Sequence, residues 1–471
     1  MTKRNVKMAS YDEQPVLKAV LQNAVPAIAA MIMVLIYNLA DTFFIAQTKN
    51  DYMIAAVSLA TPAFLIFMSL GTLFGMGGTS VISRAMGEGR TEYAKKVCSF
   101  CMWACVAVGV GCTLVFWIFM DEILVFLGTS PETEHYTRSY LMIVAGCGVF
   151  SLISNCYTNI IRAEGESTIA MGGTLLGNLA NVVLDPIMIT GFGWGVEGAA
   201  IATVIGNVIG ALFYLIYFWR GKSKLSIRMK DFSVKDGILT GVLAIGIPAS
   251  LANLLMSVSQ IITNSMMAQY GDMAVAAYGV SAKVLMVVSL IGIGLGQGIQ
   301  PLLGFCYGAR NGKRFYSILK TAAVFGLCIC FVVTAVCLVF IRPIVTAFLT
   351  DKNALEYGIE FSRILLSTGW LFGLFYVLVN ALQAMGQAKP SLIVSVSRQG
   401  LIYIPAVYLM GTMFGRTGLV WAQPVADVLS LIMVVWLLAR TIKKVFAAFC
   451  RISFEDRIVE EDKKEGMCID R

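Results

Sequence analysis

The chain has 471 residues, of which 58% are hydrophobic and only 14% are charged, and its formal net charge is +8. Charged residues make up about 25% of an ordinary soluble domain, so this composition excludes a soluble globular protein. Because the basic residues lie in alternate loops between apolar segments, the positive charge does not indicate a nucleic-acid-binding surface.

Apolar segments long enough to cross a bilayer recur from end to end, and they predict an all-α polytopic membrane protein. No cleavage site follows the first segment closely, so we expect that segment to be retained. The cysteines lie almost entirely within apolar segments, without the paired spacing of a disulfide framework. We predict twelve transmembrane helices at residues 17–47, 53–83, 94–120, 136–161, 169–190, 197–219, 237–268, 274–306, 317–341, 356–384, 391–412 and 417–440.

The linkers that follow the even-numbered spans are basic, whereas the odd-numbered linkers are poor in lysine and arginine. By the positive-inside rule, this asymmetry predicts that both termini are cytoplasmic. The basic residues are Arg84, Arg90, Lys95 and Lys96, then Arg220, Lys222, Lys224, Arg228, Lys230 and Lys235, then Arg310, Lys313, Arg314 and Lys320.

The two halves of the chain repeat. An offset of 221 residues places Gly71, Gly75, Gly77 and Gly87 on Gly292, Gly296, Gly298 and Gly308, and an offset of 220 places Asn207 on Asp427. Six spans are an even number, so the two copies have the same orientation and form a parallel repeat. We therefore expect an N-lobe of residues 1–219, a cytoplasmic basic linker of residues 220–236, a C-lobe of residues 237–446 and a cytoplasmic tail of residues 447–471.

The fifth span carries two amides and a carboxylate on one helical face, at Asn178, Asn181 and Asp185. An ionisable group inside a membrane is costly, and it usually handles an ion or a substrate. The alternative is an interhelical hydrogen-bond network that serves packing alone. We interpret this face as half of a cation or proton site.

The other half of this site is expected from three further spans of the N-lobe. Two carboxylates that share a dry site cannot both ionise cheaply, so one of them should hold a proton. Alternatively, the oxygens of Asp41, Asn181, Asp185 and Thr203 could hold Na⁺ transiently, and the sequence leaves both ions open. The candidates are Asp41, Tyr37 and Asn38 in span 1, Tyr140 in span 4, and Thr203 and Asn207 in span 6, with Asp41, Asp185, Tyr140 and Thr203 at similar depth.

The second lobe has a different chemistry. Asp427 is its one clear intramembrane acid, and it either pairs with a partner such as Arg398 or binds substrate. The neutral polar residues inside this lobe are candidates for a substrate cleft: Asn253, Ser257, Gln260, Asn264, Gln297, Asn380 and Gln383. Pro26 lies inside span 1, where it removes a backbone hydrogen bond, and it is the candidate hinge.

Catalytic chemistry is disfavoured, because no histidine–acid cluster, HExxH motif or Ser/Lys dyad lies at membrane depth. The glycine run GIGLGQG at residues 292–298 follows no strand, so it indicates helix packing and not a nucleotide site. We expect neither an enzyme nor a resident cofactor or metal.

The order and spacing of several motifs resemble multidrug and toxic compound extrusion (MATE) transporters of the bacterial type. The motifs are two six-helix lobes, the segment around Asp41, RAMGEGR with its echo CYGARNGKR, and NVVLDP in span 5. The resemblance implies a V-shaped pair of bundles in the plasma membrane. It also implies export of organic, often cationic, compounds by alternating access, driven by H⁺ or Na⁺, without a nucleic-acid partner and as a monomer.

The family's N-lobe ion site carries over to Asp41, Asn181, Asp185 and Thr203, with Tyr140 nearby. One branch of the family has acids in spans 7 and 10, but the corresponding stretches NLLMSVSQ and WLFGLFYVLVN contain none. The alternative function is that of a flippase for lipid-linked saccharides in the same superfamily. Such a protein lines its cleft with several basic residues, for which Arg363 and Arg398 are the chief candidates here.

Overall fold

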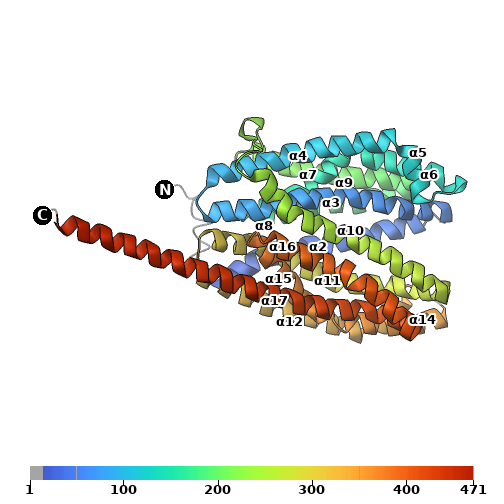
Figure 1. Cartoon of the computed structure of the whole chain (residues 1–471). Coiled ribbons are helices and arrows are strands. Elements are labelled where there is room, and N and C mark those ends of the chain that lie inside the picture. The colour runs from blue at the N-terminus through green and yellow to red at the C-terminus, as the bar shows by residue number, and fades with distance from the viewer. Residues whose placement is uncertain (1–13, 49, 350, 470–471) are drawn as a thin grey trace.

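The computed structural model describes residues 14–48, 50–349 and 351–469, and within these ranges the protein contains helices and no β-strand. The first half of the chain forms one helical bundle, drawn from blue to green in Figure 1. Its helices are α2 (Val16–Ala46), α3 (Asp51–Gly87), α4 (Thr91–Ile118), α5 (Met120–Leu127), α6 (Pro131–Gly146), α7 (Gly148–Ala163), α8 (Ser167–Asp185), the π-helix η1 (Pro186–Gly191) and α9 (Gly195–Trp219).

The second half forms the other bundle, beside the first (Figure 1). The linker holds the short helix η2 (Met229–Asp231). The bundle comprises α10 (Ile238–Met267), η3 (Ala268–Tyr270), α11 (Asp272–Gly308), α12 (Gly312–Val339), α13 (Ile341–Thr346), α14 (Lys352–Leu366), η4 (Gly369–Leu371), α15 (Phe372–Ala384), α16 (Ala388–Val396), the π-helix η5 (Ser397–Leu401) and α17 (Tyr403–Ile469). The last part of α17 extends away from both bundles (Figure 1).

The predicted twelve spans are recovered once two irregular helices are counted correctly. Ten helices in the described ranges are long and apolar enough to cross a membrane, and α6 and α7 together form a further span that is bent by 56°. The helical stretch Ala388–Lys444 has 57 residues, far more than the roughly 20 that one crossing needs. Its backbone turns at Gly415, where φ is 63°, so it crosses twice.

The repeat is visible in features that the sequence did not predict. The short helices α5 and α13 begin at Met120 and Ile341, which are one repeat offset apart. Span 4 breaks at Cys147 and span 10 at Thr368, again at matching places. The two six-helix lobes therefore share their irregularities as well as their helices.

Each lobe has its own hydrophobic core, but the first helix of each half contributes to the other lobe. Val20, Ala24 and Ile28 of α2 pack in the core of the C-lobe. Ile238 and Val242 of α10 pack in the core of the N-lobe. The starts of α2 and α10 are thus exchanged between the lobes, which places span 1 in contact with both.

Candidate ion-coupling site and C-lobe cavity

The helix that carries Asp185 changes its geometry immediately after this residue. Pro186 has no backbone N–H and cannot continue the regular α-helical ladder, and the chain proceeds as a π-helix to Gly191. Single turns of π-helix are frequent at functional sites. Asp185 is therefore fixed at the junction of two helical geometries.

Asp185 is fully buried and is bonded to Asn181, which in turn is bonded to Thr203; Asn181 and Thr203 are 2% and 6% exposed. In the orientation that satisfies both of its amide atoms, Asn181 donates a hydrogen bond to Asp185 Oδ2 over 3.2 Å. Its oxygen accepts the backbone N–H of Thr203 over 3.1 Å. The arrangement joins α8 to α9 and presents carboxylate, amide and hydroxyl oxygens together.

The second carboxylate comes from α2. Asp41 is half-buried, and its Oδ1 atom is enclosed without a hydrogen-bond partner among the described residues. Asp41, Asp185, Tyr37 and Tyr140 are close enough to interact electrostatically. Four helices, α2, α6, α8 and α9, therefore deliver charged or hydroxyl groups to one region of the N-lobe.

A glycine crossing sets the distance between α8 and α9. A Cβ atom on Gly206 would lie 2.6 Å from the carbonyl oxygen of Gly177 and 3.2 Å from Asn181 Cβ. Only hydrogen fits at this position, so the two helices approach closely enough for Asn181 to reach Thr203.

The side chains of three predicted site residues form no hydrogen bond with this cluster among the described residues. Asn38 donates to the Val34 carbonyl of its own helix over 2.8 Å. Asn178 is half-buried, and its Nδ2 atom is enclosed without a partner among the described residues. Asn207 is half-buried on α9.

The donor set suits a proton or a hard monovalent cation. Within the part of the chain that the structure describes, no three histidine, cysteine or acidic side chains are grouped as they would be around a transition metal. Carboxylate, amide and hydroxyl oxygens are ligands for hard cations, and a buried carboxylate can also take up a proton.

A cavity of about 160 Å³ lies in the C-lobe. It is enclosed mainly by α10, α11, α15, α16 and η5, and Thr72 and Met76 of α3 close one side. Of the predicted cleft residues, Asn253, Gln297, Asn380 and Gln383 line this cavity. Ser257, Gln260 and Asn264 do not, and Gln260 instead donates to Asn264 Oδ1 over 3.1 Å along the exposed side of α10.

Asp427, the remaining predicted cleft residue, is bound to Arg398. The guanidinium Nε donates to Asp427 Oδ1 over 2.9 Å, and both side chains are buried. The sequence indicated this partner as one of two alternatives. It also gave Arg398 and Arg363 as candidate cleft residues for the flippase alternative, and of these two only Arg398 lines the cavity. The sequence could not choose between them, because the direction of one side chain depends on how the surrounding helices pack.

The sequence also missed a contact between the lobes. Arg162 on α7 is only 1% exposed, and its Nη1 atom donates to Gln297 Oε1 of α11 over 2.8 Å. Arg162 follows the predicted span 4 in the short charged segment RAEGES at residues 162–167, so the sequence alone suggests a solvated residue. Its burial follows from the contact of α7 with α11.

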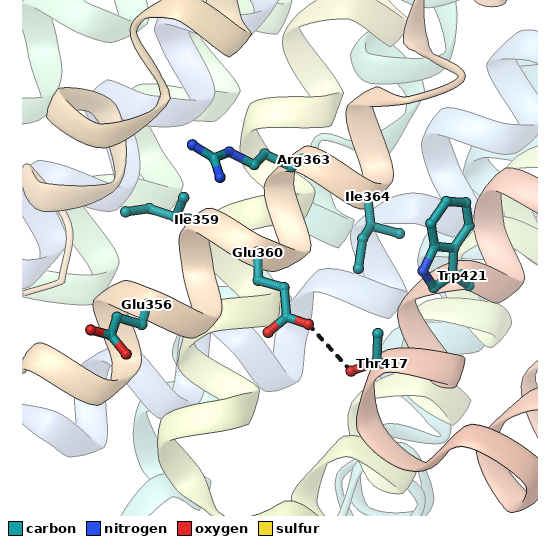
Figure 2. Close-up of a pocket in the computed structure, with 7 residues that line it drawn as sticks. All are labelled: Glu356, Ile359, Glu360, Arg363, Ile364, Thr417 and Trp421. Atoms are coloured by element: carbon teal, nitrogen blue, oxygen red, sulfur yellow. Dashed lines mark hydrogen bonds between the residues drawn. The ribbon is translucent and has the colours of Figure 1, made fainter.

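A second hollow, of about 400 Å³, lies between α14 and α17 (Figure 2). Glu360 accepts a hydrogen bond from the Thr417 hydroxyl over 3.4 Å, and Arg363 points away from Thr417 and Trp421 (Figure 2). Arg363 is exposed and does not line the C-lobe cavity. This hollow is more open than the C-lobe cavity and is separate from it.

Two repeated bundles of membrane-spanning helices, with polar groups enclosed in each, are the architecture of a polytopic membrane transporter. The family model MatE matches residues 26–187 and again residues 248–409, one match in each lobe. The chain therefore belongs to the MATE family of transporters.

Individual relatives agree with this assignment. The multidrug export protein MepA of Staphylococcus aureus (strain MSSA476) is 32% identical over 432 residues, which cover 91% of this chain and 95% of that protein. MepA of Staphylococcus haemolyticus (strain JCSC1435) is 32% identical over 419 residues, with 88% and 92% covered.

Solved structures share the fold at lower identity. A crystal structure of MATE in complex with MaL6 is 24% identical, covers 95% of this chain and all of its own, and has a TM-score of 0.89. The outward-facing conformation of a multidrug resistance MATE family transporter is also 24% identical, with a TM-score of 0.88 and 92% of this chain and 97% of its own covered.

Proposed function

We propose that this protein is a secondary active antiporter that exports hydrophobic, chiefly cationic, organic compounds in exchange for H⁺ or Na⁺. The observation that carries the proposal is the buried Asp185, which is joined through Asn181 to Thr203, with the carboxylate of Asp41 nearby. The export function of the MepA relatives, which cover nearly the whole chain, supports it. The coupling site thus belongs to the N-lobe.

Coupling follows from competition for these carboxylates. Two neighbouring acids in a low-dielectric region repel each other when both are ionised, so binding one proton or one Na⁺ ion relieves that repulsion. The bound ion therefore favours the conformation in which the two acids are close, and its release favours the alternative. An exported cation that needs the same negative charge is excluded while the ion is bound.

The basic linkers support a topology with both termini in the cytoplasm of a plasma membrane. In that orientation, the glycine contacts between the lobes lie on the cytoplasmic side. Gly87 packs against the Phe305 carbonyl, and Gly308 packs against the Arg84 carbonyl. Export then requires these contacts to open and close in each cycle, and one chain contains all the parts needed for it.

The first test is neutralisation of the two carboxylates. Asp185→Asn and Asp41→Asn should each reduce gradient-driven efflux to the background of empty vesicles, because an amide cannot exchange a proton or balance Na⁺. Efflux from proteoliposomes with separately imposed pH and Na⁺ gradients measures the loss and identifies the ion. Asp272→Asn, at the exposed start of α11, is the matched control. Normal efflux by both site variants would refute N-lobe coupling.

The second test concerns substrate charge. Carboxylates in the N-lobe should attract hydrophobic cations. Expression in a host that lacks its own pumps should therefore raise tolerance to ethidium more than tolerance to an anionic detergent. The opposite order would support the flippase for lipid-linked saccharides instead.

A further inference from the structure

The C-lobe cavity contains a positively charged group that the proposed export of cations does not use. Arg398 is 8% exposed and lines the cavity from the π-helix η5. Its guanidinium carbon lies 4.8, 4.7 and 5.2 Å from the ring centres of Phe372, Phe375 and Tyr376. Three rings and the ion pair with Asp427 thus hold one guanidinium in a fixed position.

The carboxylate partner of Arg398 is already saturated. Asp427 Oδ1 accepts hydrogen bonds from Arg398 Nε and from Gln423 Nε2, each over 2.9 Å. Its Oδ2 accepts the hydroxyl of Thr368 over 3.3 Å. Asp427 is not among the residues that line the cavity. It positions Arg398 and is not free to bind a cation itself.

The guanidinium of Arg398 contacts Asp427 through Nε and the cavity wall through Nη1. Nη1 donates to the Tyr376 hydroxyl over 2.8 Å, and Tyr376 lines the same cavity. A second buried guanidinium, that of Arg162, donates a hydrogen bond to the cavity residue Gln297. Arg162 forms no ion pair within the described residues, and its Nε and Nη2 atoms have no hydrogen-bond partner there. The electrostatic potential on this side is therefore positive.

The fold does not need the charged pair. At the offset of 221 residues, Arg398 falls on Gly177 and Asp427 falls on Gly206. In the N-lobe, the helices at this place meet through Gly177 and Gly206 without any charge. The same architecture thus forms with hydrogen atoms where the C-lobe has a guanidinium. A purely structural pair is costly, since removing two charges from water is only partly compensated by their attraction.

We propose that Arg398 is the recognition group of a C-lobe subsite for a carboxylate carried by the exported compound. The inference rests on the proposed export function and extends its substrates from simple cations to aromatic zwitterions. The cavity, at about 160 Å³, is comparable with the roughly 150 Å³ that holds one benzene ring. Asn380 Oδ1 and Gln383 Oε1, which have no partner among the described residues, add acceptors for a donor group on the same compound.

Two dyes with the same body test this inference. Rhodamine 110 carries a free carboxylate and a cationic ring system, and rhodamine 123 is its methyl ester. Their dissociation constants for the purified full chain are measured by fluorescence anisotropy, and their export is measured in proteoliposomes. The readout is the ratio of the two affinities, which cancels general effects on folding or cavity shape.

Three variants have different expected effects on the affinity ratio of the two dyes. Arg398→Gln with Asp427→Asn removes both charges together, leaves no buried ion unpaired, and should lower the preference for rhodamine 110 about tenfold, the usual value of a hydrogen bond to a charged group. Asp427→Asn alone leaves the guanidinium uncompensated and should raise that preference. Arg363→Gln removes an arginine of the same lobe outside the cavity and should leave the ratio unchanged.

An unchanged ratio in the double variant, or equal weakening of both dyes, would overturn the subsite while leaving the export proposal intact. If the unmodified protein neither binds nor exports rhodamine 123, the export proposal itself fails and the subsite fails with it. Shifts of opposite sign in the two Asp427 variants support recognition by Arg398, because a packing role predicts no such reversal.

Discussion

Glu164, just beyond the end of α7, is a carboxylate outside the membrane-spanning segments that holds the linker between the lobes. It is 6% exposed and accepts hydrogen bonds from the backbone N–H of Lys224, from the Ser223 hydroxyl over 2.7 Å and from the Tyr217 hydroxyl over 3.2 Å. Glu164→Ala should therefore lower the free energy of unfolding by about 1–3 kcal/mol, because three donors lose their acceptor. The midpoint of thermal unfolding checks this.

The same residue gives a pH dependence. Burial raises the pKa of Glu164 above its usual 4.5, although the three donors act in the other direction. The folded protein then binds this proton more tightly than the unfolded chain does. The resulting stability is present below pH 4.5 and is lost as the pH rises through the raised pKa.

Glu164→Gln removes this titration, so the stability of the unmodified protein relative to this variant should fall as the pH rises from 4.5. Unfolding midpoints over a pH series measure the difference. Glu132→Gln, on an exposed face of α6, should show no such trend. A constant difference for Glu164→Gln would mean that this carboxyl ionises like a surface residue.

The contact between Asn181 and Asp185 could be predicted from sequence, because helical periodicity fixes which residues of one helix share a face. Asn181 and Asp185 are four residues apart, and this spacing suffices to place them together. Distances between helices cannot be obtained in this way. The roles of Arg398 and Arg162 depend on which helix lies opposite. Arg398 was a candidate because it lies inside the predicted span 391–412, whereas Arg162 looks like an ordinary loop charge in the linear sequence.

At the scale of the elements, apolar length predicted the spans well and their irregularities poorly. The break at Cys147 is flanked by Gly146 and Gly148, and the π-helix η5 has the sequence SRQGL, but glycines and polar residues inside an apolar span do not specify a break or a π-turn. Pro186 was visible, but a proline does not specify whether a helix kinks, ends or widens. The repeat offset predicts irregularities better, because a break in one lobe indicates a break at the matching position in the other lobe.

Helix α2 joins the two lobes, and this gives Pro26 a specific setting. The start of α2 packs in the C-lobe core through Val20, Ala24 and Ile28, whereas Asp41 lies in the N-lobe site. Pro26 lies inside the anchored part and removes one backbone hydrogen bond there. A change of charge at Asp41 can then bend the outer part of α2 while its start stays fixed.

We therefore expect Pro26→Ala to slow efflux several-fold while dye and ion affinities stay nearly unchanged. Equilibrium dye binding and the efflux rate are measured on the same purified variant. Pro62→Ala, a proline inside α3 on an exposed face, is the matched control. Loss of binding together with efflux would mean that Pro26 shapes the site, and unchanged efflux would mean that the bend is not used.

At the scale of the whole molecule, the lobes meet through contacts at positions that are related by the repeat offset. Gly87 packs against the Phe305 carbonyl, and Gly308, one offset later, packs against the Arg84 carbonyl. Two helices, α3 and α11, thus cross at matching points where only hydrogen fits. Small residues let the two backbones approach closely, so this contact depends on a fit that a larger side chain would disrupt.

A large residue at this crossing should shift the balance between the two conformations of the transporter. The Cβ of Gly308→Leu would meet a backbone carbonyl that cannot turn aside, so the lobes should separate at the side next to the linker. In alternating access, the opposite side then closes, and efflux falls because one state is over-populated. Distances between spin labels at Glu92 and Lys313, one offset apart and both exposed, should increase.

The control is Gly279→Leu on the same helix, where an added Cβ meets nothing within 4 Å. Its label distance and efflux should match those of the unmodified protein. Gly87→Leu, the symmetric position, should widen the label distance as Gly308→Leu does, which separates a shift of conformation from a local defect on α11. If efflux is lost while the distance stays constant, the glycine crossing is a structural contact and the lobes part elsewhere.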